Sequence, residues 1–521
     1  MTLFATAKPF SLSSGERAGV RGKLLGPNRD FAAFSRSHAV EKEGTVGWNA
    51  VFTMKKQRTA TDESGHPTVT EMINLKMGAG VSNISFTSRP VTGYGGVSAL
   101  SGFFQWKSLR QTIGKSLPFQ TSSPNATPLE EIVLGYLIGM LAGAKSLSQL
   151  AFLRKDRALA QILALGSFPS QSTLTRFFQR FTQAHNHRFF SPLWRWSLNS
   201  LVSRAEGYTL DFDSTHLSHD DNEQNEGLET GYTPEGFARN YHPLIAVLGE
   251  VDLVAGFWLR RGDTRSDNNI IAFTKQVLSH LPSHIRIGLI RADSGFLEPD
   301  WLEFLEQERL SYIVVARLFK PLKRLVQTTK KWTQTSVPGI EVAEELYEGW
   351  KWPIQRRIVL IRHEMQKRPQ AGGKLLFDDK AYRYQVLMTN LPLSVEGLTV
   401  WRRYNGRAGL ENVVKELDQN FALPKTTLKS FWATEAALSL SVLSYNLSVM
   451  FQQFFKWKHP VRADTLRYRL FGTPAILITK ARKTILRLAV VGKEPRNWWR
   501  ALFTKLSSQF PNCNAVEDLV T

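Results

Sequence analysis

The stretch Tyr208–Thr215, with the sequence YTLDFDST, constrains the fold more than any other part of the chain. Its residues alternate, so the apolar Leu210 and Phe212 fall on one face of a short buried strand. Asp211 and Asp213 fall on the other face, where a carboxylate is costly unless it is paired or binds a metal ion. Asp213 stands at the strand end, where it suits either a first ligand for a hard cation such as Mg²⁺ or a side-chain cap of the turn.

Two later stretches extend this pattern. Ile287–Phe296, IGLIRADSGF, is an aliphatic run that predicts a second buried strand ending at Asp293. Tyr404–Leu417, YNGRAGLENVVKEL, has apolar residues at helical spacing, and its polar residues share another face of that helix. These polar residues are Tyr404, Arg407, Glu411 and Lys415. Two strand-end aspartates and a helix glutamate are what a site with two divalent ions around one phosphate needs.

At these residues the chain resembles the DDE transposases of bacterial insertion sequences, in the four-type superfamily and its thirteen-eighty branch. The resemblance covers about residues 87–488 and rests on six pieces in order: TSRPVTGYGG, PSQSTLTRFF, LDFDST, GYTPEGFARNYHPL, IRADSGF and YNGRAGLENVVKEL. The superfamily pattern is Tyr, two residues, Arg, three residues, Glu, six residues, Lys. Tyr404, Arg407 and Glu411 match this pattern, whereas Asp418 stands at the Lys position.

The resemblance implies that Asp213, Asp293 and Glu411 are the catalytic residues and the ligands of two Mg²⁺ ions, for which Mn²⁺ can substitute. It also implies cut-and-paste transposition, in which the protein binds the terminal inverted repeats, cleaves the strand and transfers the freed 3′-hydroxyl, first to form a hairpin and later to target DNA. A homodimer is expected, because two element ends must be brought together.

The residues themselves suggest how DNA is contacted near the metal ions. Arg407 can neutralise a phosphate, and Tyr404 can donate a hydrogen bond to another oxygen. Lys415, one helical turn from Glu411, can replace the missing lysine. Two alternatives remain open, since a fold does not fix a function. One is a metal-dependent DNA nuclease, and the other is a decayed transposase that only binds DNA sequence-specifically.

Composition limits the classes of partner. A formal charge of +21 over 521 residues favours a polyanion, and we expect nucleic acid, with a membrane surface as the alternative. The single cysteine, Cys513, excludes a disulfide framework and a cysteine-based zinc site within one chain. The longest apolar runs, 132–144 and 436–451, are too short or too interrupted to span a bilayer. We therefore expect no membrane partner and a cytoplasmic location, and the resemblance implies that this is a bacterial, nucleoid-associated one.

The first two parts of the chain differ in periodicity. Residues 1–85 lack it and are rich in Gly, Ser, Thr and charge, so we expect disorder, or an upstream extension before a start at Met54 or Met77. Residues 86–204 are expected to form a helical DNA-binding domain, with a long helix in 129–153. Its segment Gln171–Phe181, capped by Ser170 or Ser172, resembles the second helix of a helix-turn-helix. Arg176 and Arg180 would then face DNA, and solvated arginines on a plain helical subdomain are the alternative.

Residues 205–320 alternate strands, such as Tyr312–Val315, with helices, and residues 399–455 add the Glu411 helix and a long apolar helix. Together they predict an α/β fold with a ribonuclease-H-like catalytic core, a mixed sheet with helices on both faces. The polar loop 216–230 holds His216, His219, Asp220, Asp221 and Glu223, and we expect a solvated loop rather than a metal cluster. Asp263, Arg265 and Asp267 form a turn that either lines the site or is structural.

Residues 321–398 interrupt this core as a β-rich insertion, with strand-like runs at Arg356–Arg362 and Tyr382–Thr389. In it, Trp350 or Trp352 either stacks on an unpaired base or packs in the core. Residues 456–521 form a basic C-terminal region with interleaved tryptophans, which predicts phosphate binding or a solvated charged face. Its basic and aromatic residues are Arg462, Arg467, Arg469, Lys480, Arg482, Lys483, Arg487, Arg496, Arg500, Trp457, Trp498 and Trp499.

Overall fold

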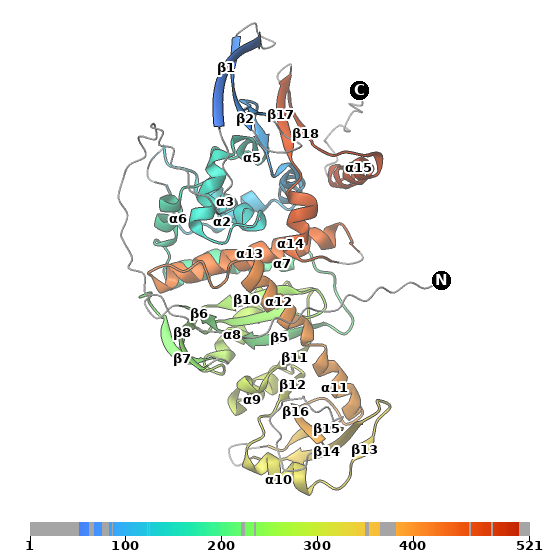
Figure 1. The fold of residues 1–521 in the computed structure, drawn as a ribbon. Coiled ribbons are helices and arrows are strands. Elements are labelled where there is room, and N and C mark those ends of the chain that lie inside the picture. The colour runs from blue at the N-terminus through green and yellow to red at the C-terminus, as the bar shows by residue number, and fades with distance from the viewer. Residues whose placement is uncertain are drawn as a thin grey trace, which may run out of the picture. The chain divides into compact units, whose positions relative to one another are not determined.

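The computed structural model describes residues 87–509, apart from short gaps, and three strands that precede them (Figure 1). The gaps are residues 122, 124, 220–223, 234–235, 350–353, 365–381, 458–459 and 481–482. Trp350, Trp352, Asp220, Asp221, Glu223 and Arg482 therefore lie outside the described residues, and the predictions made for them stay predictions. The chain divides into two compact units, Met1–Thr87 and Ser88–Thr521.

The first unit contains a small antiparallel sheet in the order β1-β2-β3. Its strands are β1 (Phe52–Thr61), β2 (Pro67–Leu75) and β3 (Asn83–Ser85). The disorder predicted for residues 1–85 is therefore wrong for these strands, while residues 1–51 lie outside the described residues. The β-branched residues of β2, such as Val69 and Ile73, are a strand signal that the composition of the whole segment conceals.

The second unit is built on one mixed sheet of nine strands, in the order β10-β9-β5-β11-β12-β16-β15-β14-β13. The strands are β5 (Tyr208–Ser214), β9 (Leu244–Leu248), β10 (Leu253–Trp258), β11 (Ile287–Ala292), β12 (Tyr312–Val315), β13 (Thr333–Gln334), β14 (Ile340–Tyr347), β15 (Arg356–Glu364) and β16 (Tyr382–Thr389). β5, β11 and β12 run parallel, and the other neighbouring pairs are antiparallel. The predicted mixed α/β architecture is thus confirmed.

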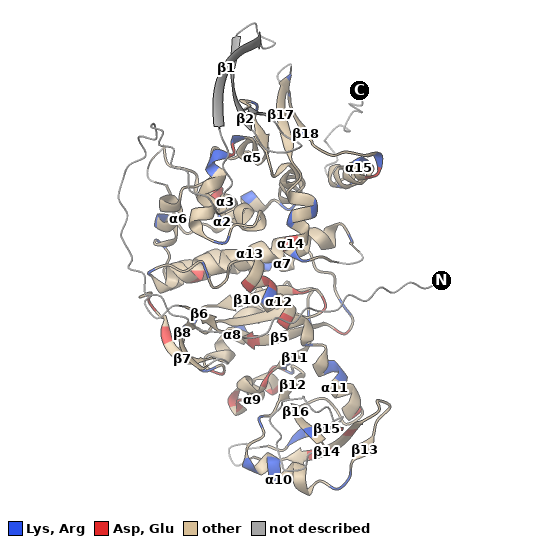
Figure 2. Cartoon of the chain, viewed as in Figure 1, with Lys and Arg blue, Asp and Glu red and all other residues tan. Residues whose placement is uncertain are grey.

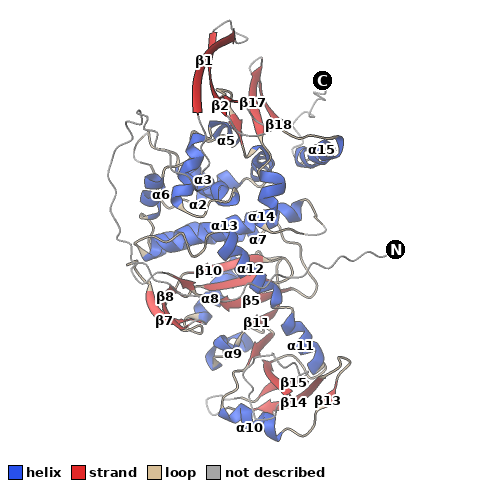
Figure 3. Cartoon of the chain, in the orientation of Figure 1, coloured by secondary structure: helices blue, strands red, loops and turns tan. Residues whose placement is uncertain are grey.

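The β-rich insertion extends this sheet. β16 pairs with β12, with Ile313 opposite Thr389, so β13–β16 continue the sheet at its β12 edge. Strand β15 is buried over most of its length, and β16 is buried in its second half, residues 386–389. The insertion and the core therefore share one hydrogen-bonded layer (Figure 3).

A second small sheet follows β5 at the strand end that carries Asp213. It contains β6 (Leu217–Ser218), β7 (Glu229–Thr233) and β8 (Gly236–Tyr241), in the order β6-β8-β7. The loop predicted at 216–230 is therefore wrong at both ends. The reason is that β7 and β8 pair as a hairpin, with Glu229 opposite Asn240, and β6 pairs with β8.

The helices of the second unit fall into two groups. Those before the sheet are α1 (Ser98–Trp106), α2 (Leu109–Ser116), α3 (Leu129–Leu141), α4 (Leu147–Phe152), α5 (Arg157–Ile162), α6 (Gln171–Phe178) and α7 (Gln183–Leu198). Those between or after its strands are α8 (Ile270–His280), α9 (Pro299–Gln307), α10 (Lys320–Thr328), α11 (Gly397–Asn405), α12 (Ala408–Asn420), α13 (Phe431–Phe454), α14 (Ala463–Leu466) and α15 (Lys493–Ser507).

Two helix ends in the first group test the sequence patterns. The single long helix predicted in 129–153 is wrong, because Gly143 adopts a φ of +106° and ends α3, after which Ser146 caps α4. The predicted cap of α6 is confirmed, since Ser170 Oγ accepts a hydrogen bond from Thr173 N at 3.0 Å. None of the described helices is by itself long and apolar enough to cross a membrane, and only the bent pair α3 and α4 meets that criterion jointly.

Helix α13 joins the helices to the sheet. It packs against α3 and α7 and against β10. On the helical side Tyr136 Oη donates to Ala437 O at 3.0 Å, and on the sheet side the Asn446 amide bonds both the N–H and the C=O of Val254, at 2.9 and 2.8 Å. The long apolar helix predicted after Glu411 is therefore the centre of the core.

The C-terminal region returns to the start of this unit. Strand β17 (Ala475–Lys480) pairs with β18 (Lys483–Leu488) and with β4 (Val91–Thr92). Arg467, which is half-buried, donates to the carbonyls of Leu141 and Met140 at 2.9 and 2.8 Å. At least this arginine of the basic region is a structural link, so the region is not a separate tail.

Candidate active site

Asp213 and Asp293 lie at the ends of two adjacent parallel strands. Arg291 on β11 is paired with Asp211 on β5, so the residues two positions further along, Asp293 and Asp213, leave the sheet side by side. Asp293 Oδ1 accepts a hydrogen bond from Gly295 N at 2.9 Å, which fixes the turn after β11. Burial raises the pKa of Asp213 to about 6, with Arg407 lowering it and Asp293 raising it.

Arg407 connects a distant helix to this strand end. Its Nη2 donates to Phe212 O at 2.8 Å and to Asp213 Oδ1 at 3.0 Å. Burial opposes the charge of Arg407, but Asp213, Tyr404 and Asp293 hold its pKa above the usual value. A permanently charged guanidinium therefore stands beside the first carboxylate.

Tyr404 completes the group that the structure brings together. Burial raises the pKa of its phenol, Arg407 opposes this, and Asp293 and Asp213 add to it. The phenol thus keeps its proton at neutral pH and can donate a hydrogen bond. Asp213, Asp293, Tyr404 and Arg407 come from three separate stretches of sequence, as predicted for one site.

Glu411 and Lys415 do not join this group in the structure. Glu411 lies in the first turn of α12 with 66% of its side chain exposed, and its carboxylate is 3.8 Å from Lys415 Nζ. Among the described residues there is no group of three His, Cys, Asp or Glu side chains placed to hold a metal ion. The structure therefore assembles two of the three predicted carboxylates.

The segment that carries these residues is not the single helix predicted from its periodicity. It breaks between α11 and α12, with Tyr404 in the last turn of α11 and Arg407 just before α12. Arg407 N donates to Tyr404 O at 2.9 Å rather than to the carbonyl of Arg403. The Arg403 carbonyl instead accepts a hydrogen bond from Arg291 Nη1. Of the predicted apolar face, Leu410, Val413 and Leu417 are buried and Val414 is partly buried.

The turn after β10 flanks the strand end through a serine. Ser214 Oγ lies 2.9 Å from Ser266 Oγ, so the turn is next to Asp213. Its acids are engaged in ion pairs, because Asp263 pairs with Arg261 at 3.1 Å and Asp267 with Arg265 at 2.7 Å. A structural role is thus favoured for Asp263 and Asp267. The contact between Ser266 and Ser214 is one that the sequence pattern did not predict.

The proposed DNA-facing arginines of the helical part lie on α6 and just after it. Arg176 is exposed on α6. Arg180 follows α6, with its guanidinium 4.2 Å from the centre of the Phe119 ring and one hydrogen bond to Gln120 O. No hydrogen bond or ion pair described for them reaches the carboxylates, so their DNA-binding role stays a prediction.

Arg291 and Asp211 form a buried ion pair that the sequence analysis did not identify. Arg291 Nε and Nη2 donate to the two carboxylate oxygens of Asp211 at 2.6 and 2.7 Å. Burial raises the pKa of Asp211, and the hydrogen bonds from Arg291 lower it. Both residues lie two positions before a predicted catalytic aspartate, and that repeated spacing was the available signal.

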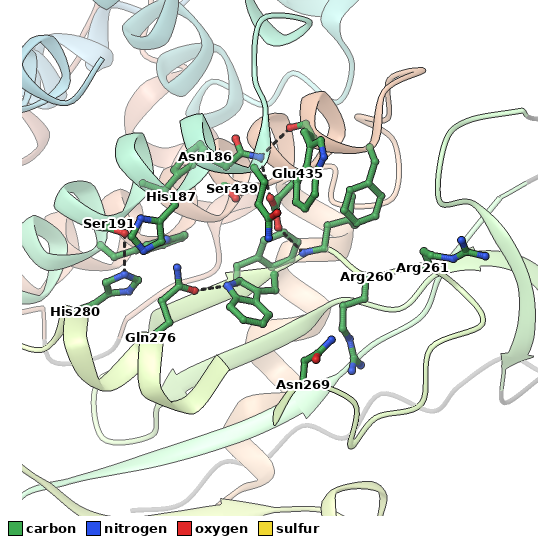
Figure 4. A pocket seen from close by; sticks show the side chains of 18 of the residues that line it. Asn186, His187, Ser191, Arg260, Arg261, Asn269, Gln276, His280, Glu435 and Ser439 are labelled. Carbon is green, nitrogen blue, oxygen red and sulfur yellow. Dashed lines mark hydrogen bonds between the residues drawn. The ribbon is translucent and has the colours of Figure 1, made fainter. Parts of the chain in front are cut away.

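A cavity of about 340 Å³ lies among α7, α8, β10 and α13 (Figure 4). Glu435 faces it and accepts hydrogen bonds from Asn186 Nδ2 at 2.8 Å and from Leu259 N at 3.2 Å. Burial raises the pKa of Glu435 to about 7, and both hydrogen bonds lower it. Asp213, Asp293 and Glu411 are not among the residues that line this cavity.

Comparison with known proteins gives one family. The family model described as transposase DDE domain group 1 matches residues 81–508. No curated protein matches the chain. Similar solved structures include the cryo-EM structure of the piggyBac transposase synaptic complex with hairpin DNA, which is 12% identical over 84% of this chain and 90% of that chain, with a TM-score of 0.39.

Proposed function

Because the chain belongs to the family of the transposase DDE domain group 1, we propose that it is the transposase of a bacterial insertion sequence. The proposed activity is cut-and-paste transposition, with cleavage at the terminal inverted repeats and transfer of the freed 3′-hydroxyl to target DNA. One observation carries the proposal: two aspartates leave adjacent parallel strand ends side by side, and Arg407 from the Tyr404–Glu411 segment is hydrogen-bonded to one of them.

The core is proposed to be ribonuclease-H-like. The support is the strand order β10-β9-β5-β11-β12, in which three parallel strands adjoin an antiparallel pair. The two aspartates lie on the central strands of that order. The chain is also proposed to belong to the thirteen-eighty branch of the four-type superfamily, because Tyr404, Arg407 and Glu411 match the pattern of that superfamily.

Asp213, Asp293 and Glu411 are proposed to hold two Mg²⁺ ions, or Mn²⁺ in their place. Two properties of the aspartates suit a divalent cation. A cation between them would relieve their mutual repulsion, and their carboxylates offer the hard oxygen donors that Mg²⁺ prefers. Glu411 lies one helical turn beyond Arg407 and would have to turn from Lys415 toward the pair. Such ions, when bound, activate the attacking oxygen and stabilise the leaving oxygen.

The protein's own residues contribute charge and orientation. Arg407 partly offsets the rise in the pKa of Asp213 that burial causes, and it presents a guanidinium beside the proposed position of the phosphate. Tyr404 keeps its proton and can donate to a phosphate oxygen. Lys415 is freed for phosphate binding when Glu411 leaves it, which would compensate for Asp418 at the lysine position of the pattern.

DNA is the proposed partner along several basic surfaces. Figure 2 shows lysines and arginines on α10, α11 and α15, and Arg176 and Arg180 add to the basic residues at α6. A chain with a formal charge of +21 favours phosphate contacts that depend on salt. A homodimer is proposed for the synaptic complex, so that each active site acts on one element end.

The test is strand joining. A labelled DNA fragment from the end of the element, with a free 3′-hydroxyl, is incubated with the protein, Mg²⁺ and a supercoiled target plasmid. A transposase produces labelled joined plasmid. A nuclease on the same fold cuts both DNAs without joining them, and a decayed transposase retains end binding without cleavage or joining; either result contradicts the proposal.

A further inference from the structure

The break between α11 and α12 is held by a side chain from the sheet. Arg291, on β11, directs one guanidinium nitrogen, Nη1, to the carbonyl of Arg403 in the last turn of α11. Its other donors, Nε and Nη2, bind both oxygens of Asp211 on β5. One buried guanidinium therefore connects the two aspartate-bearing strands to the helix that carries Tyr404.

The connection replaces a bond that the helix would otherwise make. In a continuous helix the amide of Arg407 would donate to the carbonyl of Arg403, four residues earlier. Here that amide donates to Tyr404 O at 2.9 Å, and the amide of Leu410 likewise donates three residues back, to Arg407 O at 3.0 Å. These three-residue bonds interrupt the regular hydrogen-bond ladder between α11 and α12, at the step where the Arg403 carbonyl is occupied by Arg291.

Two glycines make room for the guanidinium. A Cβ at Gly406, in the break itself, would lie 2.6 Å from Arg291 Nη1. A Cβ at Gly249, on the other side, would lie 2.9 Å from Arg291 Nη2 and from Asp211 Oδ2. Neither glycine has a positive φ, so close approach rather than backbone freedom accounts for both.

We propose that Arg291, oriented by Asp211, is a positioning residue that sets the angle between α11 and α12. Through that angle it sets where Arg407 and Glu411 stand relative to Asp213 and Asp293. This rests on the proposed function and deepens it, because it names the residue on which assembly of the third carboxylate depends. The relevant residues are close in space, since Arg407 contacts Asp213 and Glu411 is one turn further along α12.

The sheet offers a matched control in Arg356. Its Nε and Nη2 donate to Glu306 at 2.8 and 2.9 Å, and it is as buried as Arg291. This pair joins β15 to α9, and its described contacts do not include α11 or α12. Replacing either arginine by lysine removes a two-point ion pair, because an ammonium cannot reproduce the planar fork. Only the change at Arg291 removes the contact to the Arg403 carbonyl.

The test compares Arg291→Lys, Arg356→Lys and the wild type in three measurements. The first is hydrogen exchange of the backbone amides in residues 403–413. The second is cleavage of an element end as a function of Mg²⁺ concentration, and the third is affinity for the same DNA. Asp211→Asn is a second variant that keeps the shape of the pair but loses its charge, and the thermal midpoint of each variant reports general destabilisation.

We expect Arg291→Lys to increase exchange in residues 403–413 and to lower the cleavage rate by about tenfold to a hundredfold, as small misplacements of reacting groups do. The Mg²⁺ concentration for half-maximal rate should rise, with DNA affinity unchanged. Asp211→Asn should have the same effects in weaker form, and Arg356→Lys should lower only the thermal midpoint.

The proposal is overturned if Arg291→Lys matches Arg356→Lys in exchange of this segment, or in rate and Mg²⁺ dependence. If the wild type does not cleave, the proposed function fails separately. The exchange measurement then decides alone: faster exchange confined to the Arg291 and Asp211 variants supports the positioning role, and equal exchange in all variants overturns it.

Discussion

Replacing Glu435 by glutamine should change how the stability of the protein depends on pH. The carboxyl is buried on α13, and burial raises its pKa from 4.5 to about 7. Below pH 4.5 it is protonated in both the folded and the unfolded chain. As the pH rises from 4.5 to about 7, the unfolded chain releases this proton first, so the free energy of unfolding falls. The stabilisation that Glu435 contributes is therefore present at low pH and is lost as the pH rises through the pKa of this carboxyl in the folded chain.

The size of this loss follows from the two pKa values. At about 1.4 kcal/mol for each pH unit, the difference between 4.5 and about 7 is worth about 3 kcal/mol. Glu435→Gln removes this contribution, because the amide does not titrate. The variant also loses one acceptor for the two donors Asn186 and Leu259, so its stability at pH 5 should be lower than that of the wild type.

The assay is urea unfolding at pH 5 and pH 8, followed by tryptophan fluorescence and far-UV circular dichroism. The loss of stability between the two pH values should be smaller in the variant by about 3 kcal/mol. Ser439→Ala, a change at the same cavity with no titratable group, should keep the wild-type loss. An equal loss in Glu435→Gln and the wild type would refute the reasoning.

Three further changes test the core and the site. Phe212→Ala removes a fully buried ring that packs against Phe273 and Trp301, so it should lower the free energy of unfolding by about 3–5 kcal/mol in urea titrations. A loss below about 1 kcal/mol would show that the ring is not packed in this way. Arg407→Gln removes the charge that lowers the pKa of Asp213, so that pKa should rise further. The acidic limb of the pH–cleavage profile should then move to higher pH. An unmoved limb would show that Arg407 does not affect the protonation of Asp213. Asp418→Lys, which restores the family pattern on the exposed face of α12, should tighten DNA binding and steepen its salt dependence by about one unit of slope; binding unchanged at every salt concentration would remove position 418 from the DNA surface.

Local patterns in the sequence predict several strands and helices of the second unit well. Strand β12 and strand β16 begin and end at the predicted residues. Helix α13 differs by one residue at each end from the long helix that the apolar pattern predicts, Trp432–Phe455. Alternation and apolar runs suffice to predict these elements because the apolar residues of each element form its buried face. The same patterns place Asp213 and Asp293 at strand ends, and parallel pairing of β5 with β11 then brings them together.

The remaining features depend on contacts between distant residues. At the break between α11 and α12 the Arg403 carbonyl accepts a hydrogen bond from Arg291, which is 112 residues earlier, so the helical periodicity of the segment gives no sign of that contact. The joining of β16 to β12 depends on a free sheet edge, which is a property of the fold. The exposed position of Glu411 follows from the direction of α12, so it too could not be read from the spacing of the family pattern.

The central claim is that Asp213, Asp293 and Glu411 act as one metal site on DNA. The most direct measurement is cleavage of an element end by Asp213→Cys, Asp293→Cys and Glu411→Cys, with Asp418→Cys as a control on the same helix, in Mg²⁺ and in Mn²⁺. Because thiolates are softer ligands than carboxylates, all three variants should lose cleavage in Mg²⁺ and recover part of it in Mn²⁺, while the control cleaves in both. Wild-type cleavage in Mg²⁺ by any one of the three variants would contradict the account.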